Sequence, residues 1–189
     1  MRLREEVRNR PCTAVYGDIK PDNRLPIAIF TDYYCPYCPE MSARLIEMAD
    51  DLPIRLVWHE FPIFGARSER AAGVAVAAGM QGQYLPVHRH LMQAGLRPGR
   101  QAFDTLADKF GLDAERLAKD AQSTVVSGMI GRSRATAAVL GIVGTPTIVV
   151  GRTVIAGLRE KQFIEKLIVL ESETASESGY CSSLGNTAG

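Results

Sequence analysis

The chain has 189 residues, enough for one domain with a substantial hydrophobic core. Hydrophobic residues make up 46% and charged residues 23%, and 22 basic side chains balance 21 acidic ones, which argues against binding to nucleic acid or to an anionic membrane. The uncharged stretch 135–150 is interrupted by Gly141, Gly144 and Pro146 and is shorter than the roughly 20 apolar residues of a membrane-spanning helix. We therefore expect no insertion into a membrane.

The N-terminus is polar and lacks the apolar segment of an export signal, because residues 1–10 include four arginines and two glutamates. Two cellular compartments are consistent with this N-terminal sequence. The protein is cytoplasmic, or it is periplasmic or otherwise extracytoplasmic and an export signal has been removed from this chain.

The first regular elements predicted along the chain form a βαβ unit. The apolar run 27–31 is typical of a strand buried on both faces. A helical pattern follows from the cysteine pair to Leu52, with Pro36 suited to the first helical position. The segment 54–61 is predicted to be a second strand, parallel to the first.

The rest of the chain supplies a helical block and then a second pair of strands. Residues 68–140 are predicted to form four or five helices and no strand. The β-rich runs 147–150 and 153–155 predict a hairpin, and an amphipathic helix follows it.

This order predicts an α/β, thioredoxin-like fold around a four-stranded sheet, with an inserted helical domain. The N-terminal half of the thioredoxin fold would span 13–65, the helical insertion 66–140 and the C-terminal half 141–171. The Ser-, Gly- and Glu-rich segment 172–189 is expected to be a disordered tail.

Cys35 and Cys38 form a Cys-x-x-Cys pair at a predicted helix start. Unpaired N–H groups and the positive end of the helix dipole would there stabilise the thiolate of the first cysteine, which is the nucleophile in disulfide exchange. The second cysteine lies on the apolar face of the helix and would resolve a mixed disulfide. These features favour a redox-active pair.

The alternative for this pair is a zinc site, which needs two further ligands, usually closely spaced. Cys12 and Cys181 are isolated near the two ends of the chain, and His88 and His90 would point away from each other on a helix. We therefore predict no metal site and no organic cofactor. Cys12 and Cys181 are interpreted as incidental thiols or as a pair that links the termini.

Four segments together resemble the DsbA-like family of bacterial disulfide oxidoreductases. The resemblance covers about residues 17–170 and includes the helical block between the two halves. The segments, in chain order, are Phe30-Thr-Asp-Tyr-Tyr-Cys-Pro-Tyr-Cys38, His59-Glu-Phe-Pro-Ile63, Ser68 with Ala71-Ala72, and Gly141-Ile-Val-Gly-Thr-Pro-Thr147.

The resemblance implies a role for each matching residue. Cys35 is expected to be the exposed nucleophile and Cys38 the resolving thiol. Thr145 and Pro146 are expected to form a cis-proline platform beside the cysteines, where the backbone pairs with substrate; the alternative is a trans proline at a simple strand entry. Tyr33 and Tyr34 flank the pair and could form an apolar collar around it; the alternative for Tyr34 is a buried position.

Two departures from the family pattern concern residues that tune the site. The strongest oxidants of the family have histidine between the cysteines, next to the proline, where this chain has Tyr37 after Pro36. Many relatives also bury an acidic residue six positions before the first cysteine, where this chain has Ile29. Asp32 and Glu60 are candidate replacements, and each could instead be an ordinary solvated or capping carboxylate.

The sequence thus predicts a protein dithiol–disulfide oxidoreductase that exchanges a Cys35–Cys38 disulfide with protein or peptide thiols. The oxidase direction is favoured, and the resemblance suggests a quinone-linked membrane partner as re-oxidant. Two alternatives remain open: a disulfide reductase or isomerase, and a peptide-binding or chaperone module without turnover.

Overall fold

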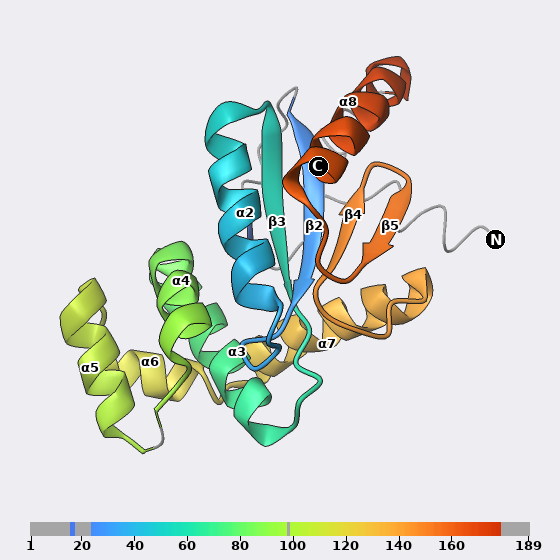
Figure 1. Ribbon diagram of the computed structural model, residues 1–189. Helices are drawn as coiled ribbons and strands as arrows, with labels where there is room; N and C mark the ends of the chain where they lie inside the picture. The colour runs from blue at the N-terminus through green and yellow to red at the C-terminus, as the bar shows by residue number, and fades with distance from the viewer. Residues whose placement is uncertain (1–15, 18–23, 98, 179–189) are drawn as a thin grey trace, which may run out of the picture.

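A five-stranded mixed sheet forms the centre of the protein, in the order β1-β3-β2-β4-β5, as the computed structural model shows for residues 16–17, 24–97 and 99–178 (Figure 1). The strands are β1 (Tyr16–Gly17), β2 (Leu25–Thr31), β3 (Ile54–Glu60), β4 (Thr147–Val150) and β5 (Thr153–Ala156). The helices of the described residues are α2 (Cys38–Asp51), α3 (Ala66–Gly79), α4 (Tyr84–Ala94), α5 (Gln101–Phe110), α6 (Ala114–Asp120), α7 (Thr124–Leu140) and α8 (Lys161–Ser178).

The pairing of the strands follows the predicted βαβ and hairpin units. β2 and β3 are parallel and joined through α2, whereas β4 runs antiparallel to both β2 and β5. The predicted sheet lacked one strand, because β1 pairs antiparallel with the outer edge of β3. A strand of two residues within a polar segment is too short to give a periodic pattern that predicts it.

Alternation along β2 separates two layers of the core. Ile27 and Ile29 are fully buried in the cluster that includes residues of α2 and α8. Ala28 and Phe30 face the opposite side, where they pack with Ala137 of α7. Because successive strand residues point to opposite faces, a continuous apolar run is what a sheet covered by helices on both sides requires.

Within its described residues, 66–97 and 99–140, the insertion consists of the five helices α3 to α7 and has no strand (Figure 1). Of these, α4 packs against α2, while α7 returns beneath the sheet toward β4. The predicted α/β architecture with a helical insertion is therefore confirmed. No helix in the described ranges has the length and apolar character needed to cross a bilayer.

Two predicted boundaries are wrong. α2 begins at Cys38 rather than at Pro36, and Pro39, which lacks an N–H, occupies its first turn. α8 continues to Ser178, so the tail predicted from residue 172 is helical over 172–178. The composition gave no sign that the Glu171 carboxylate accepts hydrogen bonds from the Arg152 N–H and Thr153 hydroxyl, which fastens the helix to the β4–β5 turn.

Candidate redox site

The two cysteines lie just beyond the carboxyl end of β2. Cys35 lies in a turn that is closed by a hydrogen bond from its N–H to the Asp32 carbonyl (3.2 Å). Cys38 is the first residue of α2. The two thiols lie close enough for Cys35 to raise the pKa of Cys38. Both are free thiols, and only 2% and 1% of their surfaces are exposed. The expectation of an exposed Cys35 is therefore wrong.

The loop before β4 explains the burial of Cys35. The Cys35 thiol donates a hydrogen bond to the Thr145 carbonyl at 3.2 Å. The Thr145–Pro146 peptide bond, for which the sequence favoured the cis form, is cis. Because β4 pairs with β2, two motifs that lie 110 positions apart in the chain meet at one end of the sheet.

Cys38 is held as a neutral thiol. Burial raises its pKa to about 12, more than the Thr31 hydroxyl and the Asp32 backbone lower it. Its sulfur therefore needs a proton acceptor nearby before it can attack, and a proton donor when it leaves a disulfide.

Asp32 joins the active-site turn to the start of the insertion. Its buried carboxylate accepts hydrogen bonds from the backbone N–H groups of Tyr34 (2.8 Å), Ile63 (2.6 Å) and Phe64 (3.2 Å). The Ser68 hydroxyl donates a fourth hydrogen bond at 2.7 Å. The sequence left two interpretations of Asp32, a replacement for the buried acid of the family or a solvated or capping carboxylate. The geometry matches a capping carboxylate, because four donors already occupy its oxygens.

Glu60 is the buried acid at the end of β3, with no exposed surface. Its Oε1 accepts hydrogen bonds from the hydroxyls of Tyr33 (2.7 Å) and Tyr84 (2.6 Å). Burial raises its pKa to about 8 against the opposing effect of these two donors. Its Oε2 has no hydrogen-bond partner among the described residues. Glu60 pairs with Thr31, whose hydroxyl reaches Cys38, so the carboxyl group lies one strand away from the contact to the sulfur.

Sequence reasoning missed the hydrogen-bonded groups behind Glu60. Tyr33 was expected at the rim of the site but is buried, and its oxygen also lies 2.9 Å from His88 Nδ1. His88 Nε2 lies 2.8 Å from the Ser42 hydroxyl on α2. The signal was present, because a glutamate that ends a buried strand needs polar partners, and Tyr84 and His88 lie four apart on one face of a helix.

The outer rim of the site is apolar. Tyr37 is 59% exposed between the cysteines, next to the exposed Pro36. Ile63 and Phe64, which Asp32 fixes, are also exposed, as is Val143 in the loop before Thr145. Among residues 24–97 and 99–178 no three His, Cys, Asp or Glu side chains lie together as metal ligands would. Cys12 and Cys181 lie outside the described residues.

Comparison with known proteins assigns the chain to a family. The model of the DSBA-like thioredoxin domain matches residues 26–169. The chain belongs to the DSBA-like thioredoxin domain family. A search of curated protein sequences finds no match.

Solved structures place this DSBA-like chain among thioredoxin-fold proteins. A thioredoxin-like oxidoreductase from Silicibacter pomeroyi DSS-3 is 32% identical, with a TM-score of 0.75 over 93% of this chain and 98% of the other. A periplasmic thioredoxin-like protein from Salmonella enterica serovar Typhimurium is 23% identical, with a TM-score of 0.72 over 92% and 98%. The thiol-disulfide exchange protein alpha-DsbA2 from Wolbachia pipientis is 21% identical, with a TM-score of 0.70 over 77% and 81%. The last two similarities show the fold alone.

Proposed function

We propose that this DSBA-like protein is a thiol–disulfide oxidoreductase that oxidises protein thiols through a Cys35–Cys38 disulfide. The observation that carries the proposal is the meeting of the cysteine pair with Thr145 and the cis Pro146. The Thr145 carbonyl accepts a hydrogen bond from the Cys35 thiol, so the loop with the cis proline lies beside the sulfur that a substrate thiolate would attack.

The reaction proceeds in two exchanges. A substrate thiolate attacks the Cys35 sulfur, the Cys35–Cys38 bond breaks, and Cys38 leaves with the electron pair and takes up a proton. A second substrate thiolate then attacks the substrate sulfur of the mixed disulfide, which forms the substrate disulfide and releases Cys35. The substrate loses two electrons and the cysteine pair gains them.

Glu60 is the proposed proton partner of Cys38. A thiol with a pKa of about 12 is a poor leaving group as a bare thiolate, so its departure is assisted by a nearby acid. The Glu60 carboxyl, with its pKa raised to about 8, holds a proton near neutral pH and has Oε2 free of hydrogen bonds from the described residues. In the reverse step the same group accepts the Cys38 proton.

The rim indicates the substrate class. Tyr37, Phe64 and Val143 present apolar surface from three segments that adjoin the site. Such a rim suits unfolded polypeptides, which expose apolar side chains beside their cysteines. Asp32 and Pro36 are proposed to keep this surface in place, with Thr145 and Pro146 as the backbone contact to substrate.

The electron acceptor is proposed to be a membrane protein that passes electrons to a quinone, and the location is proposed to be outside the cytoplasm. Oxidation of protein thiols fits an oxidising compartment. A redox potential well above about −200 mV would support the oxidase direction, and one near about −270 mV would support the reductase alternative. Equilibration with glutathione measures it.

Variants of the cysteine pair test the chemistry in a background without Cys12 and Cys181. Cys35→Ser should abolish oxidation of a dithiol peptide, and Cys38→Ser should accumulate mixed disulfides on Cys35, seen by non-reducing gels and mass spectrometry. Adducts on Cys38 would reverse the assigned roles. Binding of a thiol-free peptide without any oxidation or insulin reduction would favour the chaperone alternative.

A further inference from the structure

We infer that Ser42, His88 and Tyr33 form a proton wire that connects Glu60, at the end of β3, to a surface pocket between α2 and α4. The inference rests on the proposed function, because it explains how Glu60 recovers the proton that it gives to Cys38. The three groups come from α2, α4 and the turn after β2.

The hydrogen bonds fix the direction of the wire. The Tyr33 hydroxyl donates to Glu60 Oε1, so its oxygen must accept at the 2.9 Å contact with His88 Nδ1. Nδ1 therefore carries the hydrogen of the imidazole. Burial lowers the His88 pKa to about 3, so the ring is neutral and Nε2 is an acceptor. The Ser42 hydroxyl is the donor at that end, at 2.8 Å.

Each hydrogen bond of the wire is donated in the direction of Glu60. A proton that reaches the Ser42 oxygen displaces the Ser42 hydrogen to His88 Nε2. The Nδ1 hydrogen then moves to the Tyr33 oxygen, and the Tyr33 hydrogen moves to Glu60. One proton enters at Ser42 and one arrives at the carboxylate, while the three intermediate groups stay neutral. Rotation of the hydroxyl, imidazole and carboxyl groups prepares the next transfer.

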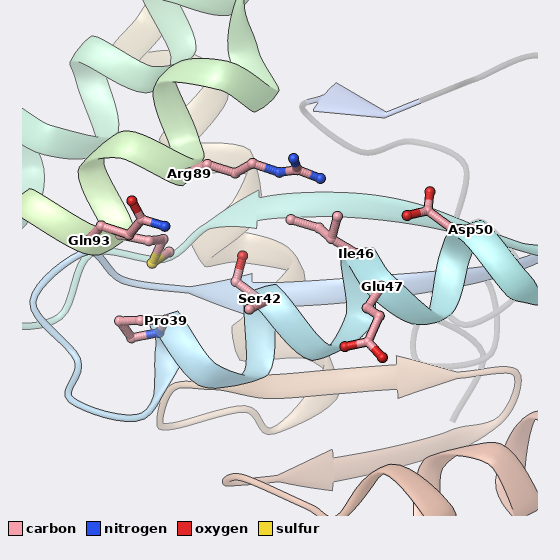
Figure 2. Close-up of a pocket in the computed structure, with 9 residues that line it drawn as sticks. Pro39, Ser42, Ile46, Glu47, Asp50, Arg89 and Gln93 are labelled. Atoms are coloured by element: carbon pink, nitrogen blue, oxygen red, sulfur yellow. The ribbon is translucent and has the colours of Figure 1, made fainter.

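The outer end of the wire opens into a pocket of about 340 Å³. Figure 2 shows the Ser42 side chain extending from α2 toward α4, where Arg89 and Gln93 line the opposite wall. The Ser42 residue itself is 3% exposed. Water in the pocket is therefore the source of the proton, and the wire is the buried link from it to Glu60.

Other groups around Glu60 set its charge but do not extend the wire. Tyr84 donates to the same oxygen as Tyr33 but lies 3.5 Å from His88. Asp32 raises the Glu60 pKa by charge repulsion, and Arg89 opposes protonation of His88. The Trp58 ring packs on the imidazole at 4.2 Å and supplies no hydrogen-bond acceptor.

The test is single-turnover reduction of the Cys35–Cys38 disulfide by excess glutathione, in H₂O and D₂O, across pH 5–9. Above the Glu60 pKa of about 8 the carboxylate starts ionised and must take up a proton through the wire before it can protonate Cys38. Quenched samples are alkylated to count freed thiols. Ser42→Ala should slow the reaction about tenfold at pH 9 and little at pH 6, where Glu60 already holds its proton; tenfold is below the roughly hundredfold of a complete proton-transfer group. It should increase the solvent isotope effect and leave the pH midpoint unchanged, because Ser42 does not touch Glu60. Ser42→Thr, which keeps the hydroxyl, should restore the rate.

Two comparisons separate the wire from general effects of burial. Ser133→Ala removes an equally buried hydroxyl on α7 that has no partner among the described residues, and should not change the rate. Tyr33→Phe and Tyr84→Phe each remove one donor to Glu60 Oε1, so both should raise the pH midpoint, but only Tyr33→Phe should also lower the maximal rate. A wild-type rate and isotope effect in Ser42→Ala, or equal rates in the two tyrosine variants, would overturn the wire. Loss of all exchange in the wild-type protein would instead refute the proposed function.

Discussion

Replacement of Glu60 by glutamine should change how stability depends on pH. The carboxyl is fully buried with its pKa raised from 4.5 to about 8. Between these values the folded protein binds one proton at Glu60 that the unfolded chain does not. The free energy of unfolding therefore falls as the pH rises from about 4.5 to 8. Glutamine stays neutral and keeps an oxygen for the Tyr33 and Tyr84 hydroxyls.

The magnitude follows from the pKa difference. The wild-type protein should lose about 1.4 kcal/mol of unfolding free energy per pH unit relative to Glu60→Gln within this window, and about 4 kcal/mol in total by pH 8. Urea denaturation of the reduced proteins at half-unit steps of pH measures the difference. The pH effects of the buried histidines occur in both proteins and cancel.

The pH range outside the window provides the control, since the two curves should run parallel below pH 4 and above pH 9. Tyr33→Phe should shift the window upward, because its hydroxyl stabilises the ionised carboxylate. A constant difference between wild type and Glu60→Gln across pH 4–9 would refute the reasoning. It would mean that Glu60 ionises in the folded protein as it does in the unfolded chain.

The remaining predictions concern other groups around the site. Burial lowers the pKa of His59 to about 4, so this residue should not affect the free energy of unfolding above pH 6.5. As the pH drops from 6.5 toward 4, the free energy of unfolding should fall by up to about 1.4 kcal/mol per pH unit. Urea titration should show a shallower fall in His59→Phe, and an identical slope would contradict this prediction. Asp32→Ala leaves four donors without their acceptor and should cost about 3 kcal/mol or more in the same assay; a loss under about 1 kcal/mol would show that water replaces the carboxylate. Tyr37→His should stabilise the Cys35 thiolate and raise the redox potential by about 30 mV per 1.4 kcal/mol of stabilisation, measured against glutathione; an unchanged potential would mean that this position does not tune the pair.

The sequence was sufficient for the parts of the fold that depend on local patterns. The continuous apolar run 27–31 located β2, and the β-rich runs on either side of Gly151-Arg152 located the hairpin. The strand–turn–helix context identified Cys35 and Cys38 as a pair. These features depend on neighbouring residues, so periodicity and turn chemistry reveal them.

The parts that the sequence did not reveal depend on contacts between distant segments. The burial of Cys35 requires the Thr145 carbonyl, 110 positions away, and the anchoring of α8 requires a contact between Glu171 and the β4–β5 turn. The same is true of Glu60, whose hydrogen-bond donor Tyr84 comes from α4, a helix that packs against α2. A pattern within one segment carries no information on which polar group another segment will bring to it.

The inserted helices consequently contribute side chains to the proposed redox site and are not only a cover for the sheet. Glu60 and Ser42 belong to the thioredoxin halves, whereas Tyr84 and His88 come from α4 of the insertion. A chimera with a helical block that lacks Tyr84 and His88 would keep both cysteines and the Thr145–Pro146 loop, yet would bury Glu60 without its Tyr84 hydrogen bond. Replacement of this block would therefore alter the surroundings of Glu60 while the Cys-Pro-Tyr-Cys segment stays unchanged.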